Sequence, residues 1–236
     1  FDEKGTVYAT STSRNNMPLD IREHPTWVPP VHTLKPVADL REFYEKELAP
    51  ERSAKNQWLP DLNQDGSNDI RDLALLKERL YRIQDTDGDG IADTSKIMIE
   101  GFNVDPTYDV AGGLLYNQGD LLIGIAPGVW RLKDDNGDGT IDRQIVISEG
   151  YSIHPAFGGH GISGLTMGPD GRIYLEVGDI GLDVTDKSGK RWSYPNQGAV
   201  MRSEPDGSNF EVFATGIRNL QEFSFDEYGN LISVDN

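Results

Sequence analysis

The chain has 236 residues, and its 22 lysines and arginines against 39 aspartates and glutamates give a formal net charge of −17. Nothing in this composition provides the clustered cations of a nucleic-acid-binding surface, so that class is excluded, and anionic membrane surfaces are disfavoured. Hydrophobic residues make up 36% of the chain, and no apolar run is long enough to span a bilayer, so we expect a water-soluble protein. The absence of cysteine excludes disulfides, thiol catalysis and iron–sulfur clusters from this segment.

A short turn motif recurs along the chain. An apolar stretch, a turn with glycine and a strand follow one another four times, and the turn glycines are at positions 5, 119, 171 and 229. Further strand pairs are predicted at residues 79–83 with 96–100, 129–132 with 144–148, and 199–202 with 211–215. Four short strands in each period of about 40–50 residues are typical of a β-propeller blade. The alternative is an unrelated series of hairpins in a β-sandwich.

The first period is about twice as long as the others, so the first blade carries an insertion. We place propeller blades at residues 1–10 and 77–236, and the insertion at residues 11–76. Prolines and two helical patterns, at residues 40–48 and 70–80, distinguish the insertion from the blades. The predicted fold is therefore all-β: a partial propeller of about three and a half blades with a small helical insertion in the first blade.

Both ends of the sequence read as strands, at residues 6–10 and 231–236. An open ring would leave unpaired sheet edges, which natural sheets avoid. We therefore expect the chain to be a segment of a longer protein. In this interpretation a C-terminal continuation, or another chain, completes a propeller of six blades.

The strongest chemical signal is an acidic loop of the pattern D-x-[DN]-x-D-G-x-x-D, which occurs three times. Calcium prefers about six to eight oxygen ligands, and alternate positions of a tight loop supply them while the glycine permits the turn. We expect up to three calcium ions, held by Asp61, Asn63, Asp65, Ser67, Asp69, Asp72, Asp85, Asp87, Asp89, Ile91 (backbone), Asp93, Asp134, Asn136, Asp138, Thr140 and Asp142. The alternative is that these are ordinary Asp-Gly hairpin turns.

The first acidic loop differs from the other two at its twelfth position. It has Asp72 there and continues into a predicted helix, so residues 61–80 resemble the loop-and-helix half of a dockerin-type calcium motif. Binding to a cohesin-like partner is a weaker hypothesis, because that motif normally occurs twice. The other loops have Lys96 and Ile145 at this position and are predicted to connect strands. Since cytosolic calcium would leave such loops empty, we expect a periplasmic or extracellular protein.

The third blade carries a motif that resembles a known family. Residues 159–181 read GHGISGLTMGPDGRIYLEVGDIG, and residues 216–221 read GIRNLQ. Both segments resemble the soluble quinoprotein glucose dehydrogenase and sorbosone dehydrogenase family, six-bladed propellers that use pyrroloquinoline quinone and calcium to oxidise sugar alcohol groups. With its acidic loops and insertion, the whole chain resembles large secreted bacterial dehydrogenase-like proteins in which a haem-binding cytochrome c domain follows the propeller.

The resemblance implies roles for four residues. His160 would be the general base, Asp179 would orient it, and Arg218 with Asn219 would hold the acidic groups of the quinone. The family's Arg-Asn-Pro-x-Gly is replaced here by Arg-Asn-Leu-Gln-Glu at residues 218–222, which adds a negative charge. The alternative interpretations are a structural histidine in a glycine-rich turn, an Asx turn at Asp179 and an interblade ion pair at Arg218. His154 is a rival base outside the motif.

These patterns predict the propeller part of a calcium-binding, quinoprotein-type dehydrogenase. It would oxidise a small sugar or alcohol and pass electrons to a cytochrome c-type haem partner on a continuation or another chain. Because the family's remaining cofactor ligands would lie in later blades, we expect this segment to be inactive by itself. The alternative is a catalytically inactive, calcium-stabilised propeller that serves as a binding or assembly module.

Overall fold

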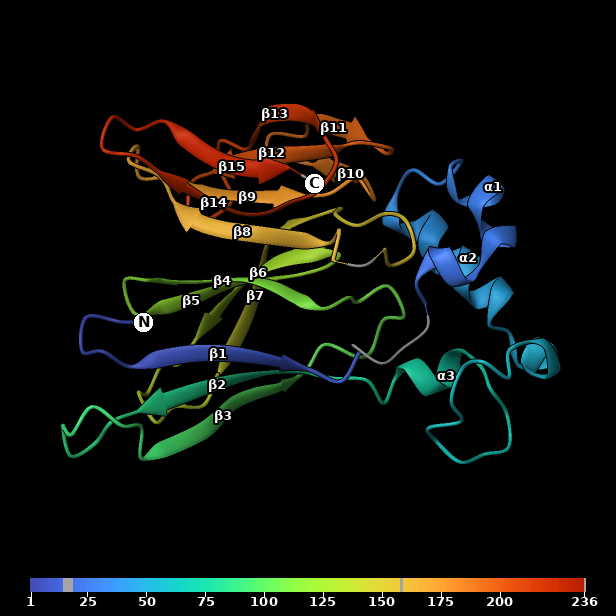
Figure 1. Cartoon of the computed structure of the whole chain (residues 1–236), viewed down its shortest axis with the longest axis horizontal. Coiled ribbons are helices and arrows are strands. Elements are labelled where there is room, and N and C mark those ends of the chain that lie inside the picture. Colours follow the sequence, from blue (N-terminus) through green and yellow to red (C-terminus); the bar gives the residue numbers. More distant parts are fainter. Residues whose placement is uncertain (15–18, 158, 236) are drawn as a thin grey trace.

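The structure is a computed structural model that describes residues 1–14, 19–157 and 159–235. Antiparallel strands make up most of it, and short helices gather at one end (Figure 1). In chain order the elements are β1 (Val7–Thr12), η1 (Ile21–Glu23), η2 (Pro25–Trp27), α1 (Val28–Val31), α2 (Val37–Glu47), η3 (Pro50–Lys55), α3 (Ile70–Leu73), β2 (Glu78–Gln84), β3 (Thr94–Gly101), β4 (Ala111–Asn117), β5 (Asp120–Ile125), β6 (Gly128–Lys133), β7 (Arg143–Glu149), β8 (Ile162–Met167), β9 (Ile173–Val177), β10 (Leu182–Thr185), β11 (Arg191–Tyr194), β12 (Gly198–Ser203), β13 (Glu211–Ile217), β14 (Leu220–Phe225) and β15 (Leu231–Asp235).

The strands form blades that stack side by side. Two sheets have four antiparallel strands, in the orders β4-β5-β6-β7 and β8-β9-β12-β13, and the sheet β1-β2-β3 and the hairpin β14-β15 flank them. Strand β4 lies against β1 and β8, and β8 also lies against β14, so the first strands of successive blades are neighbours. This is the arrangement of a β-propeller, and the predicted all-β partial propeller is confirmed.

The repeated glycines make the turns that the sequence predicts. Gly5, Gly119, Gly171 and Gly229 have φ angles of 82°, 91°, 79° and 81°, a region that favours residues without a Cβ. The three predicted strand pairs appear as β2 with β3, β6 with β7, and β12 with β13. The last predicted strand appears as β15, and Asn236 lies outside the described residues.

The insertion leaves the first blade between β1 and β2. It packs around its own core of buried side chains, among them Trp27, Leu40, Tyr44, Leu48 and Leu59. Its first predicted helix is confirmed in substance, since α2 covers all but the last residue of 40–48.

The second predicted helix, residues 70–80, is wrong in extent. Helix α3 ends at Leu73, and residues 78–80 belong to β2, where they pair with both β1 and β3. Backbone hydrogen bonds to two neighbouring strands outweigh the helical pattern of the side chains there. The dockerin-like half-motif is thus a loop followed by a single helical turn.

The two ends of the propeller differ. The insertion end consists of residues 13–14 and 19–77, the blade connections 102–110, 150–157 and 159–161, and an unpredicted hairpin, β10-β11, between β9 and β12. The turn end consists of tight hairpins and two of the acidic loops, residues 85–93 and 134–142. The first acidic loop in the chain, residues 61–69, lies at the opposite, insertion end (Figure 1).

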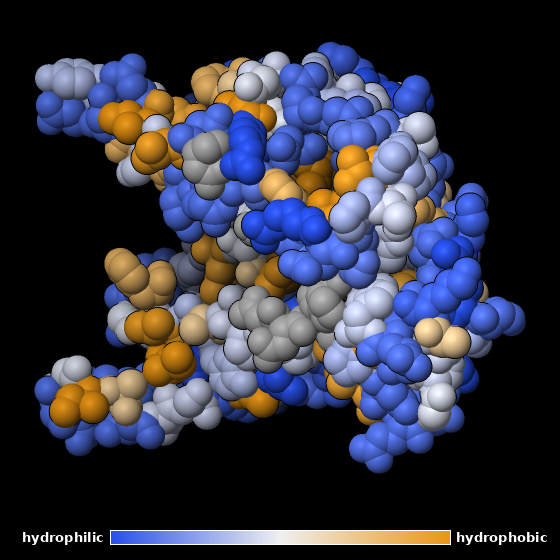
Figure 2. Space-filling view, turned by 45° about the vertical axis from the view of Figure 1, so that its right-hand side comes forward, coloured by the Kyte–Doolittle hydropathy of each residue, from blue (hydrophilic) through white to orange (hydrophobic). Residues whose placement is uncertain are grey.

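Separate apolar cores hold the blades and the insertion. One core lies between the second and third blades, around Leu122, Tyr151, Ile162 and Leu175, and another lies between the first and second blades. Hydrophilic side chains cover much of the face seen in Figure 2, as the net charge of −17 requires. Within the described ranges, no helix is long and apolar enough for a bilayer span.

Candidate functional site

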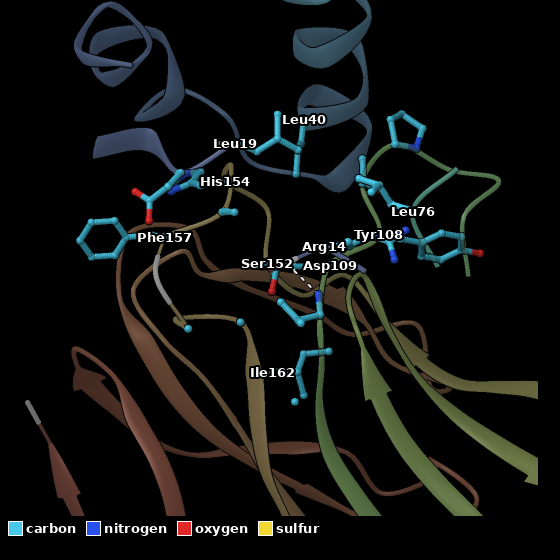
Figure 3. Close-up of a pocket in the computed structure, with 18 of the residues that line it drawn as sticks. Arg14, Leu19, Leu40, Leu76, Tyr108, Asp109, Ser152, His154, Phe157 and Ile162 are labelled. Atoms are coloured by element: carbon cyan, nitrogen blue, oxygen red, sulfur yellow. Dashed lines mark hydrogen bonds between the residues drawn. The ribbon is translucent and has the colours of Figure 1, made fainter. Parts of the chain in front are cut away.

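The insertion end contains a cavity of about 340 Å³ between the blades and the insertion. The connection before β4, the connection before β8 and the start of β14 form its lower walls. Leu19 and Leu40 from the insertion lie above it, and Asp109, Ser152 and Ile162 lie below (Figure 3). Loops that connect blades from one end of a scaffold are a common place for binding and catalytic residues.

The structure brings His160 and Asp179 together next to this cavity. His160 Nδ1 lies 2.6 Å from Asp179 Oδ1. Backbone hydrogen bonds fix both residues, because Gly178 N donates to His160 O at 3.0 Å and Asp179 N donates to Arg218 O at 2.8 Å. A Cβ at Gly178 would lie 2.8 Å from His160 O and 3.0 Å from Arg218 O, so only glycine permits this approach.

The imidazole of His160 is well covered. The residue is 4% exposed, and its ring packs edge-on against Phe157 with a centroid distance of 4.1 Å. Among the described residues, nothing forms a hydrogen bond with its Nε2. Asp179 is more open, with 36% of its side chain exposed. The pair therefore has one oriented ring nitrogen, Nδ1, and one nitrogen available to a partner.

Arg218 and Asn219 follow in the connection before β14. The Arg218 guanidinium carbon lies 5.7 Å from the centroid of Phe157, and that of Arg22 from the insertion lies 5.1 Å from it. Asn219 is 2% exposed, and its Oδ1 accepts a hydrogen bond from Gln221 at 3.0 Å. Two cations and His160 thus surround one phenyl ring, whereas the Asn219 side chain is held inside the protein.

His154, the rival base, lines the cavity itself. It is 6% exposed, and its Nε2 is buried with no hydrogen-bond partner. Burial lowers the pKa of His154 to about 4, so the ring is neutral at physiological pH. Ser152, two residues earlier, is 2% exposed and also has an unpartnered Oγ.

Glu176 in β9 is a buried acid that the sequence analysis did not assign. It is fully buried in the third blade, where Ser163 Oγ donates to its Oε1 and its Oε2 has no partner. Burial, with smaller contributions from Asp235 and Glu222, raises the pKa of Glu176 to about 8. A lone glutamate within the apolar run Ile173–Val177 was the available signal, since an acid in the middle of a buried strand is unusual.

The three acidic loops share one backbone conformation. In each loop the first aspartate accepts a hydrogen bond from the backbone N of the glycine five residues later, at 2.7 to 2.9 Å. These glycines, Gly66, Gly90 and Gly139, have φ between 82° and 88°. Side chains at the third and fifth positions accept bonds from the backbone two residues further on. The first, third and fifth side chains therefore turn toward the inside of each loop.

The loops differ in how their carboxylates gather. Oxygens of Asp85, Asp87 and Asp89 lie within 4.8 Å of one another, a spacing suited to a metal ion. The other loops have Asn63 and Asn136 at the third position, whose amide oxygens can ligate calcium but add no charge. Asp69 is the N-cap of α3, and Asp72 accepts bonds from the backbone N of Leu62 and Asn63, so both acids brace the first loop.

The sequence of the chain matches one known protein family. Residues 37–236 match the family described as a domain of unknown function, DUF7133. The chain belongs to this family. No curated protein matches the sequence of this DUF7133 chain.

Solved structures resemble the DUF7133 chain only distantly. They include a glucose dehydrogenase (20% identity, TM-score 0.31), a nidogen/laminin complex (13%, 0.28) and a luciferin-regenerating enzyme (10%, 0.33). The alignments cover 51%, 66% and 68% of this chain, and 36%, 66% and 64% of those chains. The chain thus spans about a third of the glucose dehydrogenase, and none of these likenesses bears on its activity.

Proposed function

We propose that this chain is the propeller part of a calcium-binding, quinone-dependent dehydrogenase. Its substrate would be a sugar or another small alcohol, and its electrons would pass to a haem-containing partner. The observation that carries the proposal is the contact of 2.6 Å between His160 Nδ1 and Asp179 Oδ1 at the insertion end. A carboxylate on one ring nitrogen fixes the tautomer of a histidine that acts as a base through the other.

Two arginines near the His160–Asp179 pair could bind the acidic groups of a cofactor. Arg22 and Arg218 lie over Phe157, and a guanidinium group binds carboxylates with two parallel hydrogen bonds. Arg218 would hold the acidic groups of a quinone, and Asn219 would support the turn from inside. Asp235 accepts bonds from the backbone N of both residues, so a negative charge also lies at this turn. When bound, the quinone supplies a two-electron acceptor.

The chain's own residues would handle the proton. With Nδ1–H donated to Asp179, the Nε2 atom of His160 carries the lone pair that can accept a proton from a substrate hydroxyl. The carboxylate of Asp179 then stabilises the imidazolium that forms. The low exposure of His160 keeps water away from the ring and strengthens this electrostatic support.

Calcium belongs to the same proposal. The inward-facing oxygens of the three acidic loops suit a hard cation, and a periplasmic or extracellular location would keep such loops filled. Two of the loops lie at the turn end, away from the His160–Asp179 pair, so their ions would stabilise the blades and take no part in the chemistry.

The second candidate, a binding module without catalysis, has one observation in its favour. The ring of His160 packs against Phe157 and the residue is 4% exposed, so a substrate has little room to approach the imidazole. In that case the propeller would present the insertion end to a partner, and the His160–Asp179 contact would serve stability alone.

Dye-linked oxidation of D-glucose and a panel of alcohols tests the proposal, with the full-length protein supplied with calcium and pyrroloquinoline quinone. We expect turnover that falls at least about 100-fold in His160→Ala, the lower end of the range for a general base. Asp179→Asn should lower the rate through loss of orientation and shift its pH profile. His32→Ala is the control, because His32 is exposed and its ring nitrogen Nδ1 bonds to Asn196 at a distance from the His160–Asp179 pair. No turnover, or equal rates in all variants, would favour the binding module.

A further inference from the structure

The cavity at the insertion end is a separate feature from the His160–Asp179 pair. Gly159, Gly161 and Phe157 belong to its walls, whereas neither His160 nor Asp179 lines it, although the His160 ring packs on Phe157. Leu19 and Leu40 from the insertion lie above it, and Leu76 lines its side (Figure 3). A volume of about 340 Å³ lies at the lower end of the range for small-molecule sites.

The insertion is fastened over this cavity from several sides. Arg41 in α2 forms an ion pair of 2.5 Å with Asp105, and the backbone N of Ile21 donates to Ala156 O at 3.0 Å. The Asn103 amide also donates to the Ala74 carbonyl. These bonds link both walls of the cavity to its roof, so the space is preformed.

Two buried polar atoms in the cavity wall have no protein partner. They are Ser152 Oγ and His154 Nε2, in residues that are 2% and 6% exposed. Buried polar side chains are paired in nearly all cases, so a pair of unpartnered atoms facing one cavity points to a ligand. Ser152 is also held in an uncommon backbone conformation, φ 55°, by the bond from its N to Gly181 O at 2.9 Å.

A third polar group of the cavity wall is the carboxyl of Asp109. Its Oδ1 accepts from Val110 N at 2.7 Å, and no ion pair joins it to any described residue. Its Oδ2 and Ser152 Oγ lie 3.4 and 3.8 Å from the place where a Cβ on Gly161 would be, so the two groups meet where a side chain is missing. Burial raises the pKa of Asp109, and the loss of water outweighs the backbone hydrogen bond from Val110 and the charge of Arg14.

The neighbouring arginine acts on Asp109 through its charge and forms its own hydrogen bonds elsewhere. Arg14 also lines the cavity, but its Nη1 is bonded to the buried Glu78 at 2.9 Å and its Nη2 to Phe102 O at 2.6 Å. The other charged residues of the wall are acids: Asp20, Asp105 and Glu222. The cavity therefore disfavours an anion.

The hydrogen-bonding groups of the wall need donors. A backbone contact with Leu34 uses one nitrogen of the His154 ring, so in the neutral ring Nε2 is an acceptor. Asp109 accepts as well, and the Ser152 hydroxyl can accept. A primary ammonium group offers three N–H donors and a positive charge that can form an ion pair with Asp109, and the leucines can contact its alkyl part.

We propose that this cavity binds a small organic primary ammonium compound, with its –NH₃⁺ group held by Asp109 and Ser152 Oγ. This site is additional to the proposed dehydrogenase chemistry. It is built jointly by the insertion and two blade connections, so it gives the insertion a function in ligand binding.

A matched pair of probes tests the charge requirement. Calorimetric titration of the full-length protein with 4-amino-1-butanol and with 1,4-butanediol, at about 0.15 M ionic strength to screen surface attraction, compares an ammonium with a hydroxyl on the same chain. We expect saturable binding of the amino alcohol at one site, and at least tenfold weaker binding of the diol. No saturable binding of the amino alcohol, or equal affinity for both probes, overturns the proposal.

Substitutions test the location. Asp109→Asn keeps the shape and removes the charge, and Ser152→Ala removes one hydroxyl. We expect the first to weaken amino-alcohol binding at least tenfold and the second severalfold, while His160→Ala leaves it unchanged. Glu227→Gln, at an exposed turn, is the control for loss of one negative charge. If Asp109→Asn and Ser152→Ala both bind like the control, the probe binds elsewhere and the proposal is wrong.

Discussion

Single buried polar residues account for much of what is distinctive in this molecule. Glu176, His154 and Ser152 each place a polar atom without a partner inside the fold. The sequence suggested His154 only as a rival base and no role for the other two. A sequence pattern shows which strand a residue belongs to, but the absence of a hydrogen-bond partner arises from the packing of distant segments. Such residues could not have been found from spacing alone.

The His160–Asp179 contact is different, because the family resemblance anticipated it. Both residues lie in one glycine-rich motif of a single blade, and the motif encodes the close approach through Gly178. The structure also brings the backbone of Arg218 to this pair, since its carbonyl accepts from Asp179 N. Their catalytic and cofactor roles stay predictions.

Replacement of Glu176 by glutamine should remove a pH dependence of stability. The pKa of Glu176 rises from about 4.5 in the unfolded chain to about 8 in the folded protein, so the folded state holds the proton more tightly. Its contribution to stability is complete below about pH 4.5 and is lost as the pH rises toward about 8. The loss is on the order of a few kcal/mol.

Thermal unfolding of both proteins between pH 5 and pH 9 measures this effect. The melting temperature of the wild type should fall relative to that of Glu176→Gln as the pH rises, since the amide resembles the protonated acid. Taking the difference cancels the opposite contribution of His154, whose lowered pKa makes stability rise with pH between about 4 and 6.5. Parallel curves for the two proteins would show that Glu176 is already ionised at neutral pH.

Among the elements, the strands followed the sequence and the insertion did so only in part. Alternating apolar residues and repeated Gly turns predicted the strand pairs of three blades, because hairpin turns and strand periodicity are local properties. The prediction of a helix over residues 70–80 was wrong because residues 78–80 belong to β2 and pair with two neighbouring strands. The hairpin β10-β11 was missed because its short strands, four residues each, carry few apolar side chains.

Contact between neighbouring blades leaves no room for a side chain at Gly112 in β4. A Cβ there would lie 1.8 Å from the Ile162 backbone oxygen in β8, so Gly112→Ala must push the two strands apart. We expect a cost of about 3 kcal/mol, the upper end for overpacking, measured by urea unfolding. Gly119→Ala is the matched control, because its Cβ would meet open space and only its positive φ adds a cost of about 1–2 kcal/mol. Equal losses would contradict the close approach of β4 and β8.

The two acidic loops at the turn end should differ in their effect on stability. Loop 134–142 is bonded to the first blade, since Lys96 Nζ donates to Asp138 O at 2.7 Å and Ile141 N donates to Met98 O at 2.9 Å. Loop 85–93 is exposed along its length. An ion in loop 134–142 would therefore order a contact between blades, whereas an ion in loop 85–93 would order only its own hairpin.

Asp134→Asn should consequently remove more of the calcium-dependent stability than Asp85→Asn. The measurement is the melting temperature of each variant with saturating calcium and with chelator. The reverse order would show that the contact with the first blade forms without the ion.

At the scale of the whole molecule, the fold was predictable from the sequence and the cavity was not. The fold could be predicted because a propeller repeats one local unit, and each unit has a recognisable pattern of strands and glycine turns in the sequence. The cavity could not, because it forms only where a helical insertion docks on connections from different blades. Docking of this kind depends on contacts such as Arg41 with Asp105, which are 64 residues apart and share no motif.

Calcium should raise the melting temperature of the protein as a whole. Filling the acidic loops would add coordination energy and reduce the self-repulsion of a chain with a net charge of −17. At a hundredfold excess over Kd, one site contributes about 2.7 kcal/mol, which corresponds to a shift of roughly 5–10 °C for a domain of this size. Magnesium at the same ionic strength is the control, and an equal shift with both ions would indicate screening without specific sites.

Titration of the full-length protein with pyrroloquinoline quinone, followed by absorbance in calcium, tests the central claim most directly. The proposed function predicts saturable binding of one quinone per protein, bound quinone that is bleached when D-glucose or another substrate alcohol is added, and bleaching lost in His160→Ala while binding is kept. Quinone that binds in neither protein, or that is bleached equally in both, would contradict the claim that the His160–Asp179 pair acts as the base of a dehydrogenase.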